Sequence, residues 1–315
     1  MKILVTGGAG FIGPNLCHFL LKKHNHVICL DNFFSSSPKN ISDLLDYDNF
    51  TLIKGDIVDF DYSQLPWIPD QIYHLACPAS PKAYQKDPIY TAKICFIGTL
   101  RILEYIALSK KDIRFLFTST SEIYGDPLEH PQKESYRGNT NTVGIRSCYD
   151  EGKRIAETLI CDFYRTYQID YRIARIFNTF GPQMAPDDGR VISNFICQTL
   201  SNQDLTVYGD GSQTRSCCYI TDMVNGLYNL MNQTNILGPV NIGNPDERTV
   251  LELAETILKL IPESKSKISY MSLPKDDPQK RCPDITLAKN FWKPKIDLDT
   301  GLKLTIRYFR NILSN

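Results

Sequence analysis

Tyr149 and Lys153 stand four residues apart in a stretch that otherwise predicts a helix, so both side chains should leave the same face of that helix. A phenol has a reference pKa of about 10, so it is a weak base near neutral pH unless a fixed positive charge favours the phenolate. The Lys153 ammonium, one helical turn away, supplies such a charge. We therefore interpret the pair as a candidate for proton transfer.

Glycines interrupt the first apolar run of the chain at Gly7, Gly10 and Gly13, and a helical pattern follows them. A strand, a tight turn and a helix N-terminus in this order can hold a dinucleotide pyrophosphate, because the backbone amides and the helix dipole favour anions. A second apolar run ends in Asp31, whose carboxylate can accept from ribose hydroxyls. This pattern predicts NAD rather than NADP as the cofactor.

Polar segments follow two later apolar runs, at residues 74–81 and 118–125, and the second is rich in hydroxyl residues. In a doubly wound sheet, ligands bind beyond the carboxyl ends of the strands. A nucleotide-binding turn, then a hydroxyl cluster, then the pair Tyr149 and Lys153 is an arrangement that oxidises or reduces a carbinol against a nicotinamide. The order of the motifs therefore predicts an NAD-dependent enzyme.

Apolar runs alternate with helical patterns along the first half of the chain. We expect strands at 3–6, 27–30, 51–54, 71–75, 115–118 and 171–176. This alternation predicts an α/β fold with a Rossmann-like doubly wound parallel sheet.

Turn-rich segments after Asn178 place a boundary near residue 180. We expect an NAD-binding Rossmann domain at 1–180 and a smaller C-terminal substrate-binding lobe at 181–315, with some segments returning to the first domain. Residues 241–243 and a helix at 250–260 are assigned to the second lobe, and a closing helix to 298–312.

The composition excludes several classes of protein. Lys plus Arg and Asp plus Glu number 35 each in 315 residues, so no net charge points to nucleic acid or to an acidic membrane surface. The ten cysteines are scattered and show no Cys-x-x-Cys spacing, which indicates reduced cytoplasmic thiols and no metal site. No apolar run of about 18 residues is present, and we expect neither a leader nor a membrane anchor.

On its longer motifs the chain resembles the extended short-chain dehydrogenase/reductases, and more narrowly the UDP-glucuronate decarboxylases, also called UDP-xylose synthases. The matching segments are 74–81 with Tyr84, 119–127 with 130–132, 146–158, 174–182, 188–195, 205–215 and 276–285. The glycine turn and Tyr-x-x-x-Lys specify only the fold and the cofactor. The Thr-Ser-Glu triplet at 120–122 and Asp-Asp-Pro-Gln-Lys-Arg at 276–281 are more selective.

The resemblance implies decarboxylation of UDP-glucuronate to UDP-xylose through a transient 4-keto intermediate, with NAD reduced and reoxidised in one turnover. Tyr149 would remove the proton of the C4 hydroxyl while Thr120 bonds the same oxygen. The 4-ketone lies β to the C5 carboxylate, so loss of carbon dioxide leaves an enolate. Arg281 would stabilise the developing charge, and Glu122 would orient the sugar and take part in reprotonation.

The glycine turn and the resemblance together assign residues to each role. The catalytic set is Thr120, Glu122, Tyr149, Lys153 and Arg281. The NAD-binding set is Gly7, Gly10, Phe11, Ile12, Gly13, Asp31, Asn32, Phe33, Asp56, Ile57, Leu75, Ala76, Pro78, Tyr149, Lys153, Thr179 and Arg190. The set that binds the nucleotide sugar is Pro81, Tyr84, Lys93, Thr120, Glu122, Asn178, Val191, Phe195, Thr206, Tyr208, Arg215 and Arg281.

Three other functions stay open. A nucleotide-sugar 4,6-dehydratase shares the first oxidation but usually has an aspartate where this chain has Ser121. A 4-epimerase needs no acid or base at C5, and a non-catalytic NAD-sensing module would be expected to lose Tyr149 or Lys153.

The chain also departs from the usual pattern at Arg137, at Gln183 and at the neighbours 217 and 218, all outside the expected proton path.

Two expected helices, at 92–109 and 148–167, carry apolar residues on more than one face. We expect them to pair across a two-fold axis into a four-helix interface, which predicts a homodimer.

Overall fold

Seven parallel strands form the central sheet of the computed structural model, which describes residues 1–273 and 279–313. Their order is β11-β6-β5-β4-β1-β2-β3, so the chain winds outwards from β1 in both directions, as in a Rossmann fold. The strands are β1 (Lys2–Thr6), β2 (His26–Asp31), β3 (Phe50–Lys54), β4 (Gln71–His74), β5 (Arg114–Thr120), β6 (Tyr171–Ile176) and β11 (Pro239–Ile242). The predicted fold class and the six predicted strands are confirmed.

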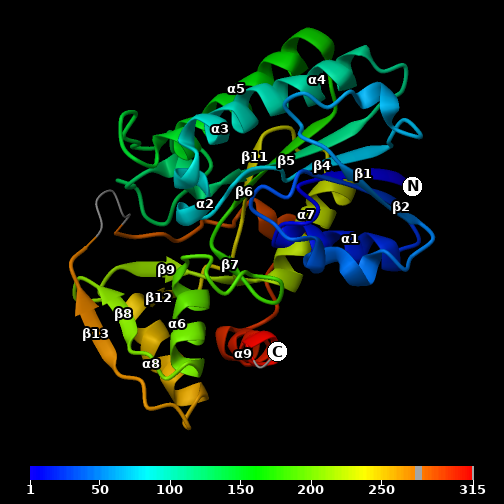
Figure 1. Cartoon of the computed structure of the whole chain (residues 1–315). Helices are drawn as coiled ribbons and strands as arrows, with labels where there is room; N and C mark the ends of the chain where they lie inside the picture. The colour runs from blue at the N-terminus through cyan, green and yellow to red at the C-terminus, as the bar shows by residue number, and fades with distance from the viewer. Residues whose placement is uncertain (274–278, 314–315) are drawn as a thin grey trace.

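The central strands carry apolar residues on both sides, and helices therefore pack on both faces of this sheet. On one face lie α1 (Ile12–Lys22) and α7 (Ile220–Gln233), and on the other lie α4 (Thr99–Leu108) and α5 (Ser147–Tyr167) (Figure 1). Alternate residues of β1 enter the two cores: Ile3 packs with the α1 side and Leu4 with the α4 side.

Helix α5 spans the residues predicted for it and begins just before Tyr149. The other expected helix, at 92–109, begins earlier, because Pro88 provides a favourable first position and Asp87 accepts from the Tyr90 amide at 2.9 Å. This helix runs as α3 (Pro88–Lys93), one π-helical segment (Ile94–Gly98) and α4. A shorter helix, α2 (Pro81–Lys86), precedes it and is capped by Ser80.

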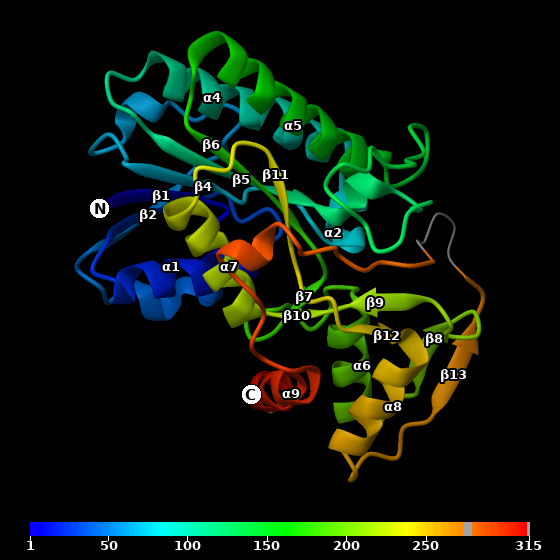
Figure 2. The same ribbon diagram turned by 180° about the vertical axis from the view of Figure 1, so that it is seen from behind.

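A smaller lobe lies beyond the carboxyl ends of the strands (Figure 2). Its elements are β7 (Thr179–Phe180), α6 (Val191–Leu200), β8 (Leu205–Tyr208), β9 (Thr214–Ser216), β10 (Cys218–Tyr219), β12 (Glu247–Thr249), α8 (Val250–Leu260), β13 (Ile268–Met271) and α9 (Leu298–Leu313). The strands pair in twos, β8 with β13, β9 with β12 and β7 with β10. The helices predicted at 250–260 and 298–312 are confirmed.

One assignment to the second lobe was wrong. Residues 241–242 belong to β11, which pairs in parallel with β6 at the edge of the central sheet. The reason is the preceding helix α7, which packs on the sheet and returns the chain to its edge, where Val240 and Ile242 become fully buried. The expected boundary near residue 180 stays a prediction. Within the described residues, no helix is long and apolar enough to cross a membrane.

Candidate active site

A cavity of about 610 Å³ opens at the carboxyl ends of the strands, between the sheet and the smaller lobe. It is lined by the glycine turn after β1, the end of β2, the segment after β4, the end of β5 and the first turns of α5. Residues of α6, β8 and β9 and Arg281 line it from the other side. All of the predicted site residues except Phe33 and Lys93 lie in this lining.

The turn after β1 packs closely against its neighbours because two of its residues, Gly7 and Gly13, lack side chains. Gly7 has a φ of +70°, and a Cβ there would lie 2.6 Å from the Ala76 nitrogen. A Cβ on Gly13 would lie 2.4 Å from the Gly7 oxygen, whereas one on Gly10 would meet nothing closer than 3.4 Å. No side chain caps the N-terminus of α1, so its first amides remain available to an anion. This cradle fits a dinucleotide pyrophosphate.

Asp31 stands at the end of β2, as predicted. Its carboxylate accepts from the Ala9 amide at 2.9 Å, from the Phe33 amide at 2.8 Å and from the Ser36 hydroxyl at 2.9 Å. These bonds fix the carboxylate in the cavity wall and leave lone pairs for ribose hydroxyls. Phe33 therefore supports Asp31 through its backbone but does not line the cavity itself.

Tyr149, Lys153 and Thr120 meet where α5 passes the end of β5. Lys153 is 3% exposed and donates to the Thr118 carbonyl at 2.8 Å, and its ammonium lies 5.9 Å from the centre of the Tyr149 ring. Tyr84 stacks on the other side of Tyr149, with ring centres 5.1 Å apart and planes 7° apart. The Tyr84 hydroxyl is buried and has no hydrogen-bond partner among the described residues, as expected of a group that awaits a ligand.

Within the protein alone, the neutral form of the Tyr149 phenol is favoured. Burial raises the pKa of Tyr149 well above its usual value, and the nearby Cys77 thiol adds to this, while the hydrogen bond with Thr120 lowers it. The effect of burial on the pKa of Tyr149 is larger than that of the hydrogen bond, because the phenol is almost fully enclosed.

Glu122 lies at the centre of an arginine cluster. Its Oε2 is ion-paired with Arg146 from the start of α5 and lies 3.3 Å from Nη2 of Arg281, which is 1% exposed. Burial opposes the charge on Glu122, but Arg281 and Arg146, with a smaller effect of Arg215, outweigh it and lower the pKa of Glu122 to about 2. Glu122 is therefore ionised at neutral pH, and the charges of three arginines act on this one carboxylate.

Asp150 faces the same cluster and behaves in the opposite way. It is 8% exposed, and its Oδ1 has no hydrogen-bond partner among the described residues. Burial, followed by the charge of Glu122, raises the pKa of Asp150 to about 7. Sequence reasoning missed both Asp150 and Arg146. The available signal was their spacing, one residue after and three residues before Tyr149.

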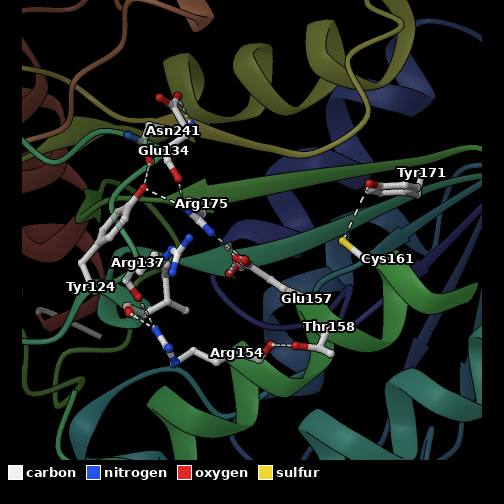
Figure 3. A network of polar contacts seen from close by, with 12 residues as sticks. Tyr124, Glu134, Arg137, Arg154, Glu157, Thr158, Cys161, Tyr171, Arg175 and Asn241 are labelled. Atoms are coloured by element: carbon white, nitrogen blue, oxygen red, sulfur yellow. Dashed lines mark hydrogen bonds and ion pairs between the residues drawn. The ribbon is translucent and has the colours of Figure 1, made fainter. Parts of the chain in front are cut away.

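A buried polar network fixes the end of β5 against α5 (Figure 3). Arg175 of β6 donates to both carboxylate oxygens of Glu157, at 3.0 and 2.8 Å, and Ser119 donates to the same carboxylate. Arg175 also donates to the Tyr124 hydroxyl at 3.1 Å, which donates to Asn241 of β11 at 2.7 Å. Glu157 lies one turn beyond Lys153, so this network positions the catalytic turn of α5.

The rest of the cavity carries the side chains expected at a nucleotide sugar. Val191 and Phe195 come from α6, Thr206 and Tyr208 from β8, and Arg215 from β9. Arg190 pairs with Asp188 at 3.2 Å at the start of α6. The remaining predicted lining residues are Phe11, Ile12, Asn32, Asp56, Ile57, Leu75, Pro78, Pro81, Asn178 and Thr179.

The structure separates Lys93 from the site. It lines a shallow apolar concavity on the outer face of α3 with Pro88, Ile89, Phe96 and others, not the cavity of Tyr149. Its position near the end of α3 turns it outward, which spacing alone did not reveal.

The other unusual positions lie at the edge of the site. Gln183 and Cys217 line the cavity, Cys218 is fully buried, and the Arg137 carbonyl accepts from Arg154 at 2.8 Å. Of the selective run 276–281, residues 276–278 lie outside the described residues.

Comparison with known proteins agrees with this site. The family model described as GDP-mannose 4,6 dehydratase matches residues 4–305, which places the fold and the site among the extended short-chain dehydrogenase/reductases. UDP-glucuronic acid decarboxylase 6 of Arabidopsis thaliana is 51% identical over 314 residues, covering 98% of this chain and 89% of the relative. UDP-glucuronic acid decarboxylase 1 of Danio rerio is 48% identical over 317 residues, covering 100% and 74%. The chain therefore belongs to the family of UDP-glucuronic acid decarboxylases.

A solved structure is also similar. UDP-glucuronic acid 4-epimerase from Bacillus cereus, in complex with UDP-glucuronic acid and NAD, is 30% identical, with a TM-score of 0.90 over 99% of this chain and 100% of that chain.

Proposed function

We propose that this chain is an NAD-dependent decarboxylase that converts UDP-glucuronate to UDP-xylose and carbon dioxide. The observation that carries this proposal is the meeting of two sets of groups in one cavity: Tyr149 with Thr120, and Glu122 with Arg146 and Arg281. The first set suits oxidation of a carbinol, and the second suits a substrate that carries a carboxylate. The relatives named UDP-glucuronic acid decarboxylase support the same reaction.

The glycine turn and Asp31 would hold NAD. When bound, NAD supplies a reversible hydride acceptor and a positively charged ring that favours an ionised phenol. Tyr149 then takes the C4 hydroxyl proton and later returns it, while Thr120 holds the same oxygen. Lys153 donates to the Thr118 carbonyl, and this bond fixes its amino group beside the phenol.

The arginine cluster around Glu122 binds the carboxylate of the substrate. The three guanidinium groups of Arg146, Arg215 and Arg281 exceed the single charge of Glu122, so the cavity attracts a substrate with a carboxylate and a diphosphate. Once C4 is a ketone, loss of carbon dioxide from C5 leaves an enolate, whose charge Arg281 stabilises. Glu122, ionised because of its low pKa, orients the sugar and the water through which C5 takes a proton from solvent.

The rival reactions use less of this cavity. Ser121 stands before Glu122 and its carbonyl accepts from Arg281, so this position offers no carboxylic acid for the elimination of water by a 4,6-dehydratase. A 4-epimerase acting on UDP-glucuronate would use the arginines around Glu122 only to hold the carboxylate and would release no carbon dioxide.

Incubation of the purified chain with UDP-glucuronate should release carbon dioxide and form UDP-xylose in equal amounts. UDP-glucose, which has the same nucleotide but no carboxylate, is the control and should release none. Turnover of the neutral sugar without release of carbon dioxide from UDP-glucuronate would contradict the proposal.

We further propose that the chain forms a homodimer through α3, α4 and α5. The concavity on this face is lined by apolar residues, and Ile89 and Phe96 are 71% and 40% exposed. Apolar surface of this kind is typical of an interface. Light scattering at micromolar concentration should give a dimer for the wild type and a monomer for Phe96→Lys, with Tyr270→Lys in the smaller lobe as the control. A monomeric wild type would rule the interface out.

A cytoplasmic location stays a prediction from the scattered cysteines.

A further inference from the structure

Two thiols touch behind the catalytic turn. Cys77 follows β4, and Cys95 lies in the π-helical segment between α3 and α4, yet their sulfur atoms are only 3.3 Å apart. Sulfur atoms this close need to approach by little more than 1 Å to reach the disulfide bond length of about 2.05 Å. The fold thus brings two thiols that are 18 residues apart in sequence, on separate elements, close to disulfide distance.

The two thiols differ in access and in charge. Cys77 lines the cavity, so a small solute can reach it, whereas Cys95 is 2% exposed and lies behind it. Burial opposes a thiolate at Cys77, but the hydrogen bond with Cys95 and the nearby Lys153 ammonium hold the pKa of Cys77 below its usual value. Cys77 is therefore placed to react first, and Cys95 to resolve the product.

We propose that Cys77 and Cys95 form a hydroperoxide-sensitive disulfide that slows the enzyme reversibly. The Cys77 thiolate attacks the peroxide oxygen, which breaks the O–O bond and gives a sulfenic acid and an alcohol or water. The Cys95 sulfur then displaces the sulfenic oxygen, which leaves as water with the Cys95 proton. In sum, two thiols are oxidised to one disulfide and one hydroperoxide is reduced. The second step releases one water, and the first releases an alcohol or, from hydrogen peroxide, another water.

This bond would act on the site through close backbone packing. Ala76, next to Cys77, lies so near the glycine turn that a Cβ on Gly7 would be 2.6 Å from its nitrogen. On the other side, a Cβ on Gly152 would be 2.9 Å from the Cys95 Cβ, so Cys95 rests against the α5 turn that carries Lys153. Drawing the two sulfurs together shifts the cofactor cradle relative to the catalytic turn. A misplacement of about 1 Å can cost about 100-fold in rate.

A third cysteine nearby provides an internal comparison. Cys148 is close enough to raise the pKa of Cys95, and Cys77 raises the pKa of Cys148. The Cys148 thiol nevertheless lies 3.7 Å from the Tyr84 carbonyl and lines the outer concavity. We therefore expect Cys77 to pair with Cys95 and not with Cys148.

Peptide mapping by mass spectrometry after limited hydrogen peroxide tests the pairing in the full wild-type chain without any variant. We expect one disulfide-linked peptide pair containing Cys77 and Cys95, and its disappearance after dithiothreitol. In Cys148→Ser the pair should still form. In Cys95→Ser it should not, and Cys77 should instead be trapped as a sulfenic acid by dimedone. Oxidation of other thiols without this pair would overturn the proposal.

The effect on turnover rests on the proposed function and is measured separately. Release of carbon dioxide from UDP-glucuronate should fall about 10- to 100-fold as the linked peptides accumulate and should recover with dithiothreitol. Full formation of the disulfide with unchanged turnover would overturn the regulatory part. Absence of decarboxylation in the reduced chain would instead count against the proposed function, and the peptide map would still decide the pairing.

Discussion

The two halves of the cavity are built in different ways. Tyr149, Lys153 and Thr120 lie on one helix and one strand of the central fold, and Glu157 of the helix joins the two by accepting from Ser119 of the strand. Glu122 meets Arg281 across 159 positions of sequence, through an ion pair and not through a shared element. The oxidation half is thus set by regular secondary structure, and the carboxylate half by long-range charge pairing.

This difference indicates how one fold serves several reactions. Hydride and proton transfer at C4 need a fixed geometry, which a strand end and a helix turn provide. The step after oxidation depends on which charges face C5, and these come from the short turn after β5, the start of α5 and the segment around Arg281. The groups that decide the product can therefore change without disturbing the sheet.

The largest expected effect comes from the oxidation half. Tyr149→Phe removes the acid and base for the C4 hydroxyl, so turnover of UDP-glucuronate should fall at least about 10³-fold. NAD binding, followed by fluorescence titration, should change little. Tyr105→Phe, a partly buried tyrosine that stacks on Tyr62 away from the cavity, is the matched control. Near wild-type turnover in Tyr149→Phe would refute the assigned proton path.

Neutralising Glu122, at the centre of the carboxylate half, should separate C4 oxidation from decarboxylation. Glu122→Gln keeps the Tyr149 set intact, so C4 oxidation should continue, while release of carbon dioxide should slow about 10²-fold. On rapid mixing with UDP-glucuronate, the absorbance of reduced nicotinamide should rise and persist. Glu129→Gln, on an exposed loop of the same segment, should behave as wild type. Equal loss of both steps would mean that the two halves are not separable.

The sequence predicted the first half better than the second for a physical reason. Local periodicity reveals a glycine turn, an Asp31 at a strand end and a Tyr149 on a helix, because each depends on neighbours in sequence. The same reasoning found the six strands but missed β11, whose four residues include the polar Asn241. Arg146 and Asp150 were missed because their role arises only when Glu122 is brought against them.

Lys93 shows the same limit from the other side. A resemblance placed it at the substrate, whereas its helix turns it to the outer face. No local pattern distinguishes a lysine near the end of a helix that faces a cavity from one that faces outward.

The network around Glu157, which joins α5 to β5 and to the neighbouring β6, should be costly to remove. Glu157→Gln leaves the guanidinium of Arg175, whose side chain is 10% exposed, without its charge partner, so the free energy of unfolding should fall by about 3 kcal/mol. Turnover should fall about tenfold with little change in KM, because Glu157 positions Tyr149 but does not line the cavity. Urea unfolding and steady-state kinetics measure both.

The matched control for this network is Asp162→Asn on the same helix. Both side chains of its ion pair with Arg165 are exposed, so the free energy of unfolding should change by no more than about 0.5 kcal/mol. If Glu157→Gln lost stability but kept full turnover, the network would hold the fold without positioning the catalytic turn.

The smallest expected effect concerns pH within the carboxylate half. Burial and Glu122 raise the pKa of Asp150 to about 7, against about 3.9 for an unfolded aspartate. Its contribution to stability is fully present below pH 4 and is lost as pH rises through 7, because the unfolded state ionises first. Glu122, with its pKa of about 2, does the reverse and loses its contribution as pH falls below about 4.

Asp150→Asn removes the first of these titrations. The difference between its free energy of unfolding in urea and that of the wild type should therefore increase by about 2 kcal/mol from pH 5 to pH 7 and then level off. Asp162→Asn, whose carboxylate is exposed, should keep a constant difference over the same range. A constant difference for Asp150→Asn would show that Asp150 is already ionised at pH 5, and that the arginines of this half reach beyond Glu122 to control both carboxylates.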